Sequence, residues 1–159
     1  MFFRPPTPVI LSVPHYRQRS TADCLAACAW MICRYWGSAI PYPELIALLG
    51  TTPDVGTPFP NLRRLARQGF RVQIVAGTLA GLYRLLQDGQ PVVVSVQTGE
   101  LPYWQNEWSQ HAVVVVGMTE STILLNDPVV QPAPIGVSLG NFDLAWLAQG
   151  EVFAVITPA

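Results

Sequence analysis

The sequence predicts an α+β domain in which N-terminal helices pack on a mostly antiparallel β-sheet. Segments with apolar residues at helical spacing fill most of residues 21–90, whereas short apolar runs rich in valine fill most of residues 91–158. Two of these runs, 111–117 and 122–127, are joined by a short turn, which favours an antiparallel hairpin. Helices followed by strands, without strict alternation along the chain, are typical of α+β domains.

The longest predicted helix spans residues 21–37, "TADCLAACAWMICRYWG". Thr21 or Asp23 can cap its first turn, and Gly37 can end it. Apolar residues recur in it at steps of three or four, which predicts one stripe that faces the core. The residues of this stripe are Cys24, Ala27, Cys28, Met31, Ile32 and Tyr35.

The remaining elements follow from the same patterns. Residues 8–16 are apolar but contain prolines, which favours a short edge strand or an extended arm. Residues 98–110, rich in aromatic and polar side chains, and residues 128–137 are expected to be loops. Further helices are expected at 41–50, 57–70, 78–90 and 141–150, and further strands at 71–75, 91–97 and 151–158.

Length and composition limit the classes of protein. The 159 residues suffice for one domain, 1–159, with residues 1–12 as a candidate extended arm. Half of the residues are hydrophobic (50%) and 12% are charged, which excludes a disordered chain. A net charge of −1 and the absence of lysine argue against nucleic-acid binding. The N-terminus lacks the features of a signal peptide, and no apolar run is long enough to span a bilayer.

The three cysteines do not follow the pattern of a metal site or of a secreted, disulfide-bonded domain. Cys24, Cys28 and Cys33 stand at positions i, i+4 and i+9 of one predicted helix, which matches no common zinc spacing. A disulfide between neighbouring turns of a helix would be strained, so Cys28 and Cys33 are expected in the core. Because an odd number of cysteines fits a reducing compartment, we expect a cytoplasmic protein. We also expect that it needs neither a metal nor an organic cofactor.

His111 and Asp127 lie at equal distances along the chain from Thr119, the middle of the predicted hairpin turn. In the simplest register the two are cross-strand neighbours, with Cβ atoms roughly 5 Å apart. Asp127 would then accept a hydrogen bond from the imidazole, fix its tautomer and stabilise its protonated form. A bulge would shift the register by one residue and make Asn126 the alternative orienting group.

Cys24 falls in the first turn of its helix, where free N–H groups and the helix dipole stabilise an anion. A histidine nearby would increase the thiolate fraction further and carry a proton to a leaving group. Gln18 stands just ahead of the helix, and its amide together with the backbone N–H of Cys24 can form an oxyanion hole. This set is typical of an acyl-transfer site, although a cysteine such as Cys24, taken alone, is more often an ordinary buried residue.

Four residues near these groups are candidates for substrate binding. Trp104 and Trp108 lie in the aromatic loop, where they either line a cleft together with Tyr103 or serve the interior or an interface. The other two candidates are Leu25, directly after the candidate nucleophile, and Gln110, directly before the candidate histidine.

Two stretches, "QRSTADCLAACAWMICRYWG" and "HAVVVVGMTESTILLNDP", resemble the motifs of papain-like cysteine peptidases. The order of a glutamine, a cysteine at a helix start, a histidine at a strand start and an aspartate is most similar to the bacteriocin-processing branch of that family, the double-glycine leader peptidases. The stretches "LRRLARQGF" and "FDLAWLAQGEVFAVI" also resemble that branch. The resemblance therefore covers most of the chain.

The resemblance implies a papain-like cysteine peptidase fold and hydrolysis of a peptide or isopeptide-like amide bond. It implies that Cys24 is the nucleophile, His111 the general base and acid, Asp127 the group that orients it, and Gln18 the oxyanion donor. The expected partner is a peptide or protein substrate, with a partner protein as a further candidate. Two other functions stay open: a catalytically silent module that binds a peptide or partner, and an acyl transferase or transpeptidase.

The sequence departs from the family pattern at two points. Leu25 stands where the family usually has glycine, which narrows or reshapes the site beside the cysteine. No transmembrane or ATPase region follows, so we expect a stand-alone form, in contrast to family members that are domains of exporters. Cleavage of double-glycine leaders therefore does not transfer directly to this chain.

Overall fold

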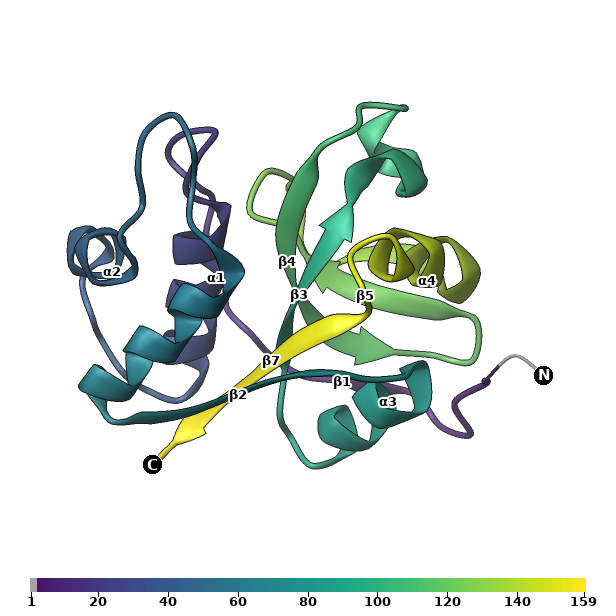
Figure 1. Ribbon diagram of the computed structural model, residues 1–159. Helices are drawn as coiled ribbons and strands as arrows, with labels where there is room; N and C mark the ends of the chain where they lie inside the picture. Colours follow the sequence, from purple (N-terminus) through teal and green to yellow (C-terminus); the bar gives the residue numbers. More distant parts are fainter. Residues whose placement is uncertain (1–2) are drawn as a thin grey trace.

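The centre of the fold is a seven-stranded sheet. The structure is a computed structural model that describes residues 3–159, and residues 1–2 of the predicted arm lie outside the described residues. The strands are β1 (Val9–Ile10), β2 (Phe70–Ala76), β3 (Val92–Gln97), β4 (Gln110–Met118), β5 (Thr122–Asn126), β6 (Ile135–Ser138) and β7 (Val152–Pro158). Their order is β2-β7-β3-β4-β5-β6, with β1 paired to β4, and every pair is antiparallel (Figure 1). The predicted α+β class is confirmed.

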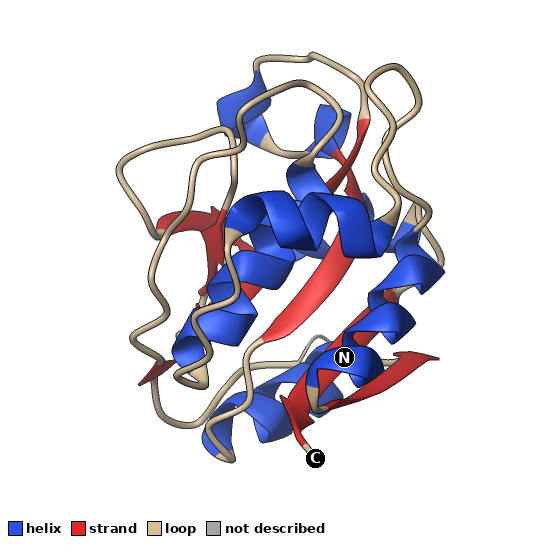
Figure 2. Cartoon of the chain, turned by 90° about the vertical axis from the view of Figure 1, so that its left-hand side faces the viewer, coloured by secondary structure: helices blue, strands red, loops and turns tan. Residues whose placement is uncertain are grey.

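Helices cover both faces of this sheet (Figures 1 and 2). They are α1 (Cys24–Tyr35), α2 (Tyr42–Leu49), the 3-10 helix η1 (Phe59–Gln68), α3 (Leu79–Gln87), the short 3-10 turns η2 (Thr98–Glu100) and η3 (Pro102–Trp104), and α4 (Leu139–Leu147). One hydrophobic core lies between the sheet and α1, α2 and η1, and a second lies between the sheet and α3 and α4. Across residues 3–159, no helix combines the length and the apolar character needed to cross a membrane.

Strand β4 contributes to both cores because its side chains alternate between the two faces of the sheet. Val114 and Val116 belong to the core under α1, whereas Val113 and Val115 belong to the core under α3 and α4. By the same alternation, His111 at the start of the strand lies on the face of Val113 and Val115. The strand therefore fixes the backbone position and the face of the sheet from which the His111 side chain extends.

Most of the predicted stripe of α1 is buried, but the helix is covered on almost every side, so its burial extends beyond that stripe. Leu25, Ala26 and Ala29 lie outside that stripe and are nevertheless buried. The reason is that α1 packs against the sheet on one side and against α2 on another (Figure 1). A helix covered in this way needs small or apolar residues around most of its circumference.

Asp23 occupies the N-cap position of α1, but its side chain does not cap the helix, which corrects the prediction. The carboxylate instead turns back and accepts hydrogen bonds from the backbone N–H of Arg19 at 3.0 Å and of Ser20 at 2.8 Å. The buried hydroxyl of Tyr42 also donates to it. Burial alone would raise the pKa of Asp23, but these hydrogen bonds lower it. The ionised carboxylate thus holds the loop that leads into α1.

The β4–β5 hairpin does not have the simple register that its turn suggested. Val114 pairs with Asn126, and a bulge further along the hairpin shifts the pairing by one residue. Continuing the register of this pair past the end of β5 places Asp127 opposite Val113, so His111 is a diagonal neighbour of Asp127 rather than a direct one. The amide of Asn126 donates to a backbone carbonyl of the N-terminal segment at 3.0 Å and does not orient His111.

Two predicted segments take a different form. Most of β6 lies inside residues 128–137, which were expected to be a loop, and it pairs with β5. The prolines of this segment mask the strand pattern. Within the predicted helix 57–70, Phe59–Gln68 form a 3-10 helix rather than an α-helix, and Phe70 already belongs to β2.

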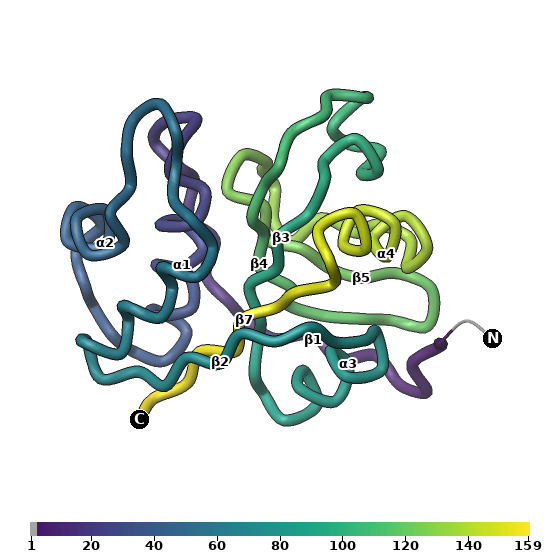
Figure 3. Tube along the Cα trace, viewed as in Figure 1, coloured from purple at the N-terminus to yellow at the C-terminus, as the bar shows by residue number. Residues whose placement is uncertain are grey.

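The N-terminal segment crosses from the α3 side of the sheet to the α1 side (Figure 3). Near its start, β1 pairs with β4. Further on, it runs along the residues after β5: the Nε2 atom of His15 lies 2.7 Å from the carbonyl oxygen of Asp127, and the N–H of Gln18 donates to the carbonyl of Pro128 at 2.9 Å. These contacts bring Gln18 close to the chain segment that carries Asp127.

Candidate active site

A cleft of about 480 Å³ opens between the start of α1, the segment before η1, and strands β3 and β4. Cys24 and His111 both lie in its walls, although 87 residues separate them in sequence. Within residues 3–159, no three His, Cys, Asp or Glu side chains are grouped in a way that would hold a metal ion. The lining residues are Thr21, Ala22, Cys24, Leu25, residues 54–59, Ser95 and residues 109–112.

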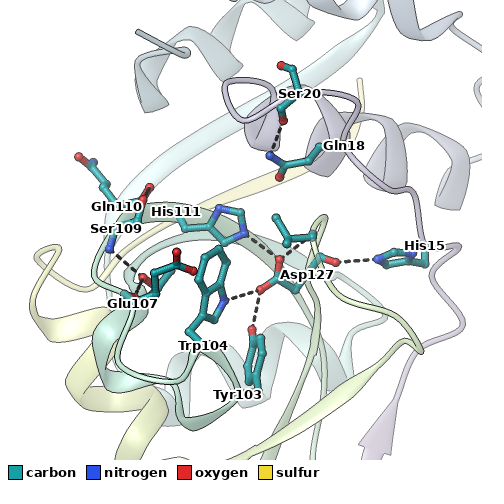
Figure 4. Close-up of polar contacts among 12 residues, drawn as sticks. His15, Gln18, Ser20, Tyr103, Trp104, Glu107, Ser109, Gln110, His111 and Asp127 are labelled. Atoms are coloured by element: carbon teal, nitrogen blue, oxygen red, sulfur yellow. Dashed lines mark hydrogen bonds and ion pairs between the residues drawn. The ribbon is translucent and has the colours of Figure 1, made fainter. Parts of the chain in front are cut away.

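His111 and Asp127 form a buried pair beside this cleft (Figure 4). The Nε2 atom of His111 lies 2.7 Å from Oδ1 of Asp127, and the two residues are only 6% and 1% exposed. Asp127 also accepts hydrogen bonds from the backbone N–H of Val129 at 2.9 Å, the hydroxyl of Tyr103 at 2.7 Å and the indole N–H of Trp104 at 3.0 Å. Four donors therefore converge on one carboxylate, which favours its ionised form.

The same contacts set the charge of the imidazole. Burial alone would lower the pKa of His111, but hydrogen bonds with Asp127 and Cys24, and the negative charge of both partners, raise the pKa to about 9. Burial alone would raise the pKa of Asp127, but the hydrogen bond and charge of His111, together with the other donors, lower it. At neutral pH the pair is therefore an imidazolium beside a carboxylate.

Cys24 is the first residue of α1 and lies half-buried in the wall of the cleft that His111 also lines. At this position, the first N–H groups of the helix lack partners within the helix and favour an anion. Cys28 and Cys33 are also free but lie in the core. Burial raises the pKa of Cys28 well above its ordinary value and that of Cys33 to about 12. Cys24 is thus the one cysteine placed to react with a molecule in the cleft.

Gln18 lies in the loop before α1, beside Ser20 (Figure 4), and it is not among the residues that line the cleft. Its Nε2 atom donates to the carbonyl of Ser20 at 2.6 Å. Its Oε1 atom is buried and has no hydrogen-bond partner among the described residues. A side-chain amide carries two N–H bonds. One N–H of Gln18 therefore holds the side chain in place, and the other has no hydrogen-bond partner among the described residues.

Of the four residues predicted to bind substrate, Leu25 and Gln110 line the cleft, whereas Trp104 and Trp108 do not. Trp108 is 63% exposed and covers Gly99, where an added Cβ atom would lie 2.1 Å from the indole. Trp104 turns away from the cleft lining toward the buried pair described above. Of the two tryptophans in the aromatic loop, Trp108 thus lies at the surface, and Trp104 contacts the pair of His111 and Asp127.

Sequence reasoning missed three parts of this region. Residues 54–59 form one cleft wall but carry no chemical pattern that marks them. Ser95 lines the cleft from β3, and a polar residue inside an otherwise apolar strand was a signal that could have identified it. His15 contacts the carbonyl of Asp127 through the path of the N-terminal segment, which no local pattern encodes.

The family model for the peptidase C39 family matches residues 12–155. The chain belongs to the peptidase C39 family. It is therefore a cysteine peptidase, and the resemblance to bacteriocin-processing, papain-like peptidases is confirmed. A comparison with curated proteins finds no significant match.

Solved structures of C39 peptidases share the fold. A chain described as a C39-like peptidase from Bacillus anthracis is 20% identical, with a TM-score of 0.78, over 96% of this chain and 98% of that one. A double glycine motif protease from an AMS/PCAT transporter, solved in complex with the leader peptide, is 18% identical, with a TM-score of 0.75, over 99% of this chain and 100% of that one. The peptidase domain of Streptococcus ComA is 20% identical, with a TM-score of 0.74, over 91% of this chain and 98% of that one.

Proposed function

We propose that this C39 peptidase hydrolyses a peptide amide bond with Cys24 as nucleophile, His111 as general acid and base, Asp127 as its orienting group and Gln18 as an oxyanion donor. One observation carries the proposal. The imidazole of His111 is bound through one ring nitrogen to the buried carboxylate of Asp127, and it shares a cleft with the thiol of Cys24 at a helix start. This arrangement supports a thiolate and imidazolium pair poised for nucleophilic attack.

The chemical steps follow from these positions. The thiolate of Cys24 attacks the carbonyl carbon of the scissile bond and forms a tetrahedral oxyanion. The bond from carbon to nitrogen then breaks, and the imidazolium of His111 gives its proton to the leaving amine. Water next attacks the thioester while the neutral imidazole takes a proton from it, which releases the acid and restores the ion pair.

The oxyanion would be held by two donors at the start of α1. The backbone N–H of Cys24 is one, because the first N–H groups of a helix have no partner within the helix. The free N–H of the Gln18 amide is the other. The loop that carries Gln18 is held by the carboxylate of Asp23, so the donor is positioned before substrate binds. Such preorganisation supports stabilisation of the transition state.

The proposed substrate is a peptide in extended form. The cleft lies between the start of α1 and strands β3 and β4, and the related transporter protease was solved with a leader peptide. Leu25, which replaces the small residue expected after the nucleophile, occupies part of the wall beside Cys24. Three free thiols fit a reducing compartment, so the proposed location is the cytoplasm. A partner protein is a further candidate for binding.

The proposal is tested by incubating the protein with a peptide library that includes double-glycine leader peptides and by identifying the products with mass spectrometry. We expect cleavage by the wild-type protein and by the control Cys33→Ala, which alters a core cysteine outside the cleft. Cys24→Ala and His111→Ala should reduce cleavage by about 10³-fold or more. Cleavage by Cys24→Ala at the wild-type rate would refute the proposed nucleophile. Products joined to an added amine, in place of hydrolysis products, would instead identify a transferase.

A further inference from the structure

Two side chains of the aromatic loop share one oxygen of Asp127 (Figure 4). The hydroxyl of Tyr103 donates to Oδ2 at 2.7 Å, and the indole N–H of Trp104 donates to the same atom at 3.0 Å. The other oxygen, Oδ1, faces Nε2 of His111 and the N–H of Val129. Each carboxylate oxygen is therefore held by two groups.

The chemistry of these donors fixes the state of the carboxylate. An indole N–H and a backbone N–H can only donate, and Trp104 and Val129 place one such donor on each oxygen. A proton on either oxygen would displace one of these bonds. Burial and the charge of Asp127 raise the pKa of Tyr103, so its hydroxyl also keeps its proton. The carboxylate therefore stays an acceptor on both sides.

The tautomer of the imidazole follows from this arrangement. Because Oδ1 of Asp127 can only accept, Nε2 of His111 must carry a proton to form the 2.7 Å bond. The Nδ1 atom is then the nitrogen left to exchange a proton with the thiol of Cys24. Loss of a donor on Oδ2 would free the carboxylate to rotate and weaken this choice.

Trp104 also restrains the ring directly. Its indole packs against the imidazole of His111 with ring centroids 5.0 Å apart and an interplanar angle of 63°. One side chain thus contacts both members of the buried pair, and the imidazole is held by an edge contact as well as by a hydrogen bond.

The loop that carries these two residues is itself anchored. The buried hydroxyl of Thr98 donates to the carbonyl of Glu107 at 2.6 Å and accepts the N–H of Ser109 at 2.8 Å. Ser109 and the residue after it line the cleft. The same loop therefore forms part of the cleft wall and supports the pair behind it.

We propose that Tyr103 and Trp104 are positioning residues that lock the carboxylate of Asp127 and thereby fix the tautomer and orientation of His111. The inference rests on the proposed function, since it concerns the same pair. It adds two residues outside the cleft lining. Tyr103 acts on the chemistry through Asp127 alone, and Trp104 acts through both Asp127 and the imidazole of His111.

The test is ¹H–¹⁵N NMR of the imidazole in the double variant Tyr103→Phe/Trp104→Phe, which keeps both rings and removes both donors. The chain has two histidines, so His15→Gln in each protein leaves the His111 signals alone. The matched control is Tyr35→Phe/Trp36→Phe, which removes a hydroxyl that donates to Gly89 and an indole N–H that donates to Ile156, both away from the cleft.

Above pH 9, where the ring of His111 is neutral, we expect wild type and control to show a single tautomer with the proton on Nε2, and at neutral pH a low-field N–H signal. The double variant should show mixed tautomers above that pH and a weakened low-field signal. With a cleaved peptide, its kcat should fall on the order of tenfold while KM changes little, because neither residue lines the cleft. If the double variant does not fold, Tyr103→Phe alone is measured against Tyr35→Phe.

A tautomer and an N–H signal of His111 equal to those of the control would overturn the inference. These NMR measurements need no substrate. A protein that cleaves no peptide but shows the expected NMR change would therefore refute the proposed function and leave the positioning role intact. Cleavage without the NMR change would support the proposed function and refute the positioning role of Tyr103 and Trp104.

Discussion

Asp127→Asn keeps the shape of the side chain but removes its charge and one of its two acceptor oxygens. Four groups donate to the carboxylate, and an amide can accept with one oxygen only, so its NH₂ group must face two of these donors. The ring of His111 then loses the hydrogen bond and the charge that hold its proton. Because burial opposes the charged ring, we expect its pKa to fall from about 9 toward its ordinary value or below.

The size of the effect follows from proton linkage. Between pH 6.5 and about 9, the folded wild-type protein keeps the proton on His111 while the unfolded chain has released it. The stabilisation is therefore complete below pH 6.5 and is lost as the pH rises through about 9, at about 1.4 kcal/mol per pH unit, or roughly 3 kcal/mol in total. The lowered pKa of Asp127 acts only on acidification, where its contribution to stability is lost.

The assay is urea unfolding of both proteins at pH 6.5 and at pH 9.5 under reducing conditions. The raised pKa values of Cys28 and Cys33 also reduce stability as the pH rises, because the unfolded thiols ionise first. This loss is common to both proteins and cancels in their difference. The wild-type free energy of unfolding should therefore fall by roughly 3 kcal/mol more than that of Asp127→Asn. An equal fall in both proteins would refute the charged pair.

Three other variants test separate parts of the site. Gln18→Ala should lower kcat about 100-fold through loss of an oxyanion donor, while the exposed control Gln73→Ala leaves it unchanged; equal rates in both would remove Gln18 from the mechanism. Tyr42→Phe removes a buried donor to Asp23 and should lower the free energy of unfolding by about 1 to 3 kcal/mol in urea, and an unchanged midpoint would contradict this. Leu25→Ala should widen the cleft beside Cys24 and speed the alkylation of Cys24 by bulky reagents relative to iodoacetamide. The free energy of unfolding should fall by about 2 to 5 kcal/mol. An unchanged ratio of the two alkylation rates would show that Leu25 does not limit access to Cys24.

The sequence pattern predicts most elements of the fold, because apolar spacing distinguishes helices from strands. The long helix that begins at Cys24 and the valine-rich strand that begins near His111 illustrate this. Local spacing cannot show how many sides of an element are covered, so the burial of Leu25 and Ala29 was not predicted. Nor can it place the turn, which is closed between Thr119 and Thr122 rather than centred on Thr119, so the register of the hairpin was wrong although His111 and Asp127 still meet.

The parts of the site that were not predicted depend on contacts between distant segments. The side chain of Trp104 reaches Asp127 only because the aromatic loop folds back beside the end of β5. The carboxylate of Asp23 binds the preceding loop and a tyrosine on α2 instead of its own helix, since burial beside Tyr42 offers it better donors. Motifs thus predicted the candidate reactive groups, whereas the groups that contact them became visible only in three dimensions.

The rate at which iodoacetamide alkylates Cys24 at pH 6 is the most direct test of the central claim, that the thiol of Cys24 and the imidazole of His111 act as one unit. Peptide mapping by mass spectrometry identifies the modified residue. We predict that the wild-type protein is labelled at Cys24 and that His111→Ala reacts at least about tenfold more slowly, because its thiol lacks the imidazolium that stabilises the thiolate. Equal rates in the two proteins, or labelling at Cys28 or Cys33 instead, would contradict the claim.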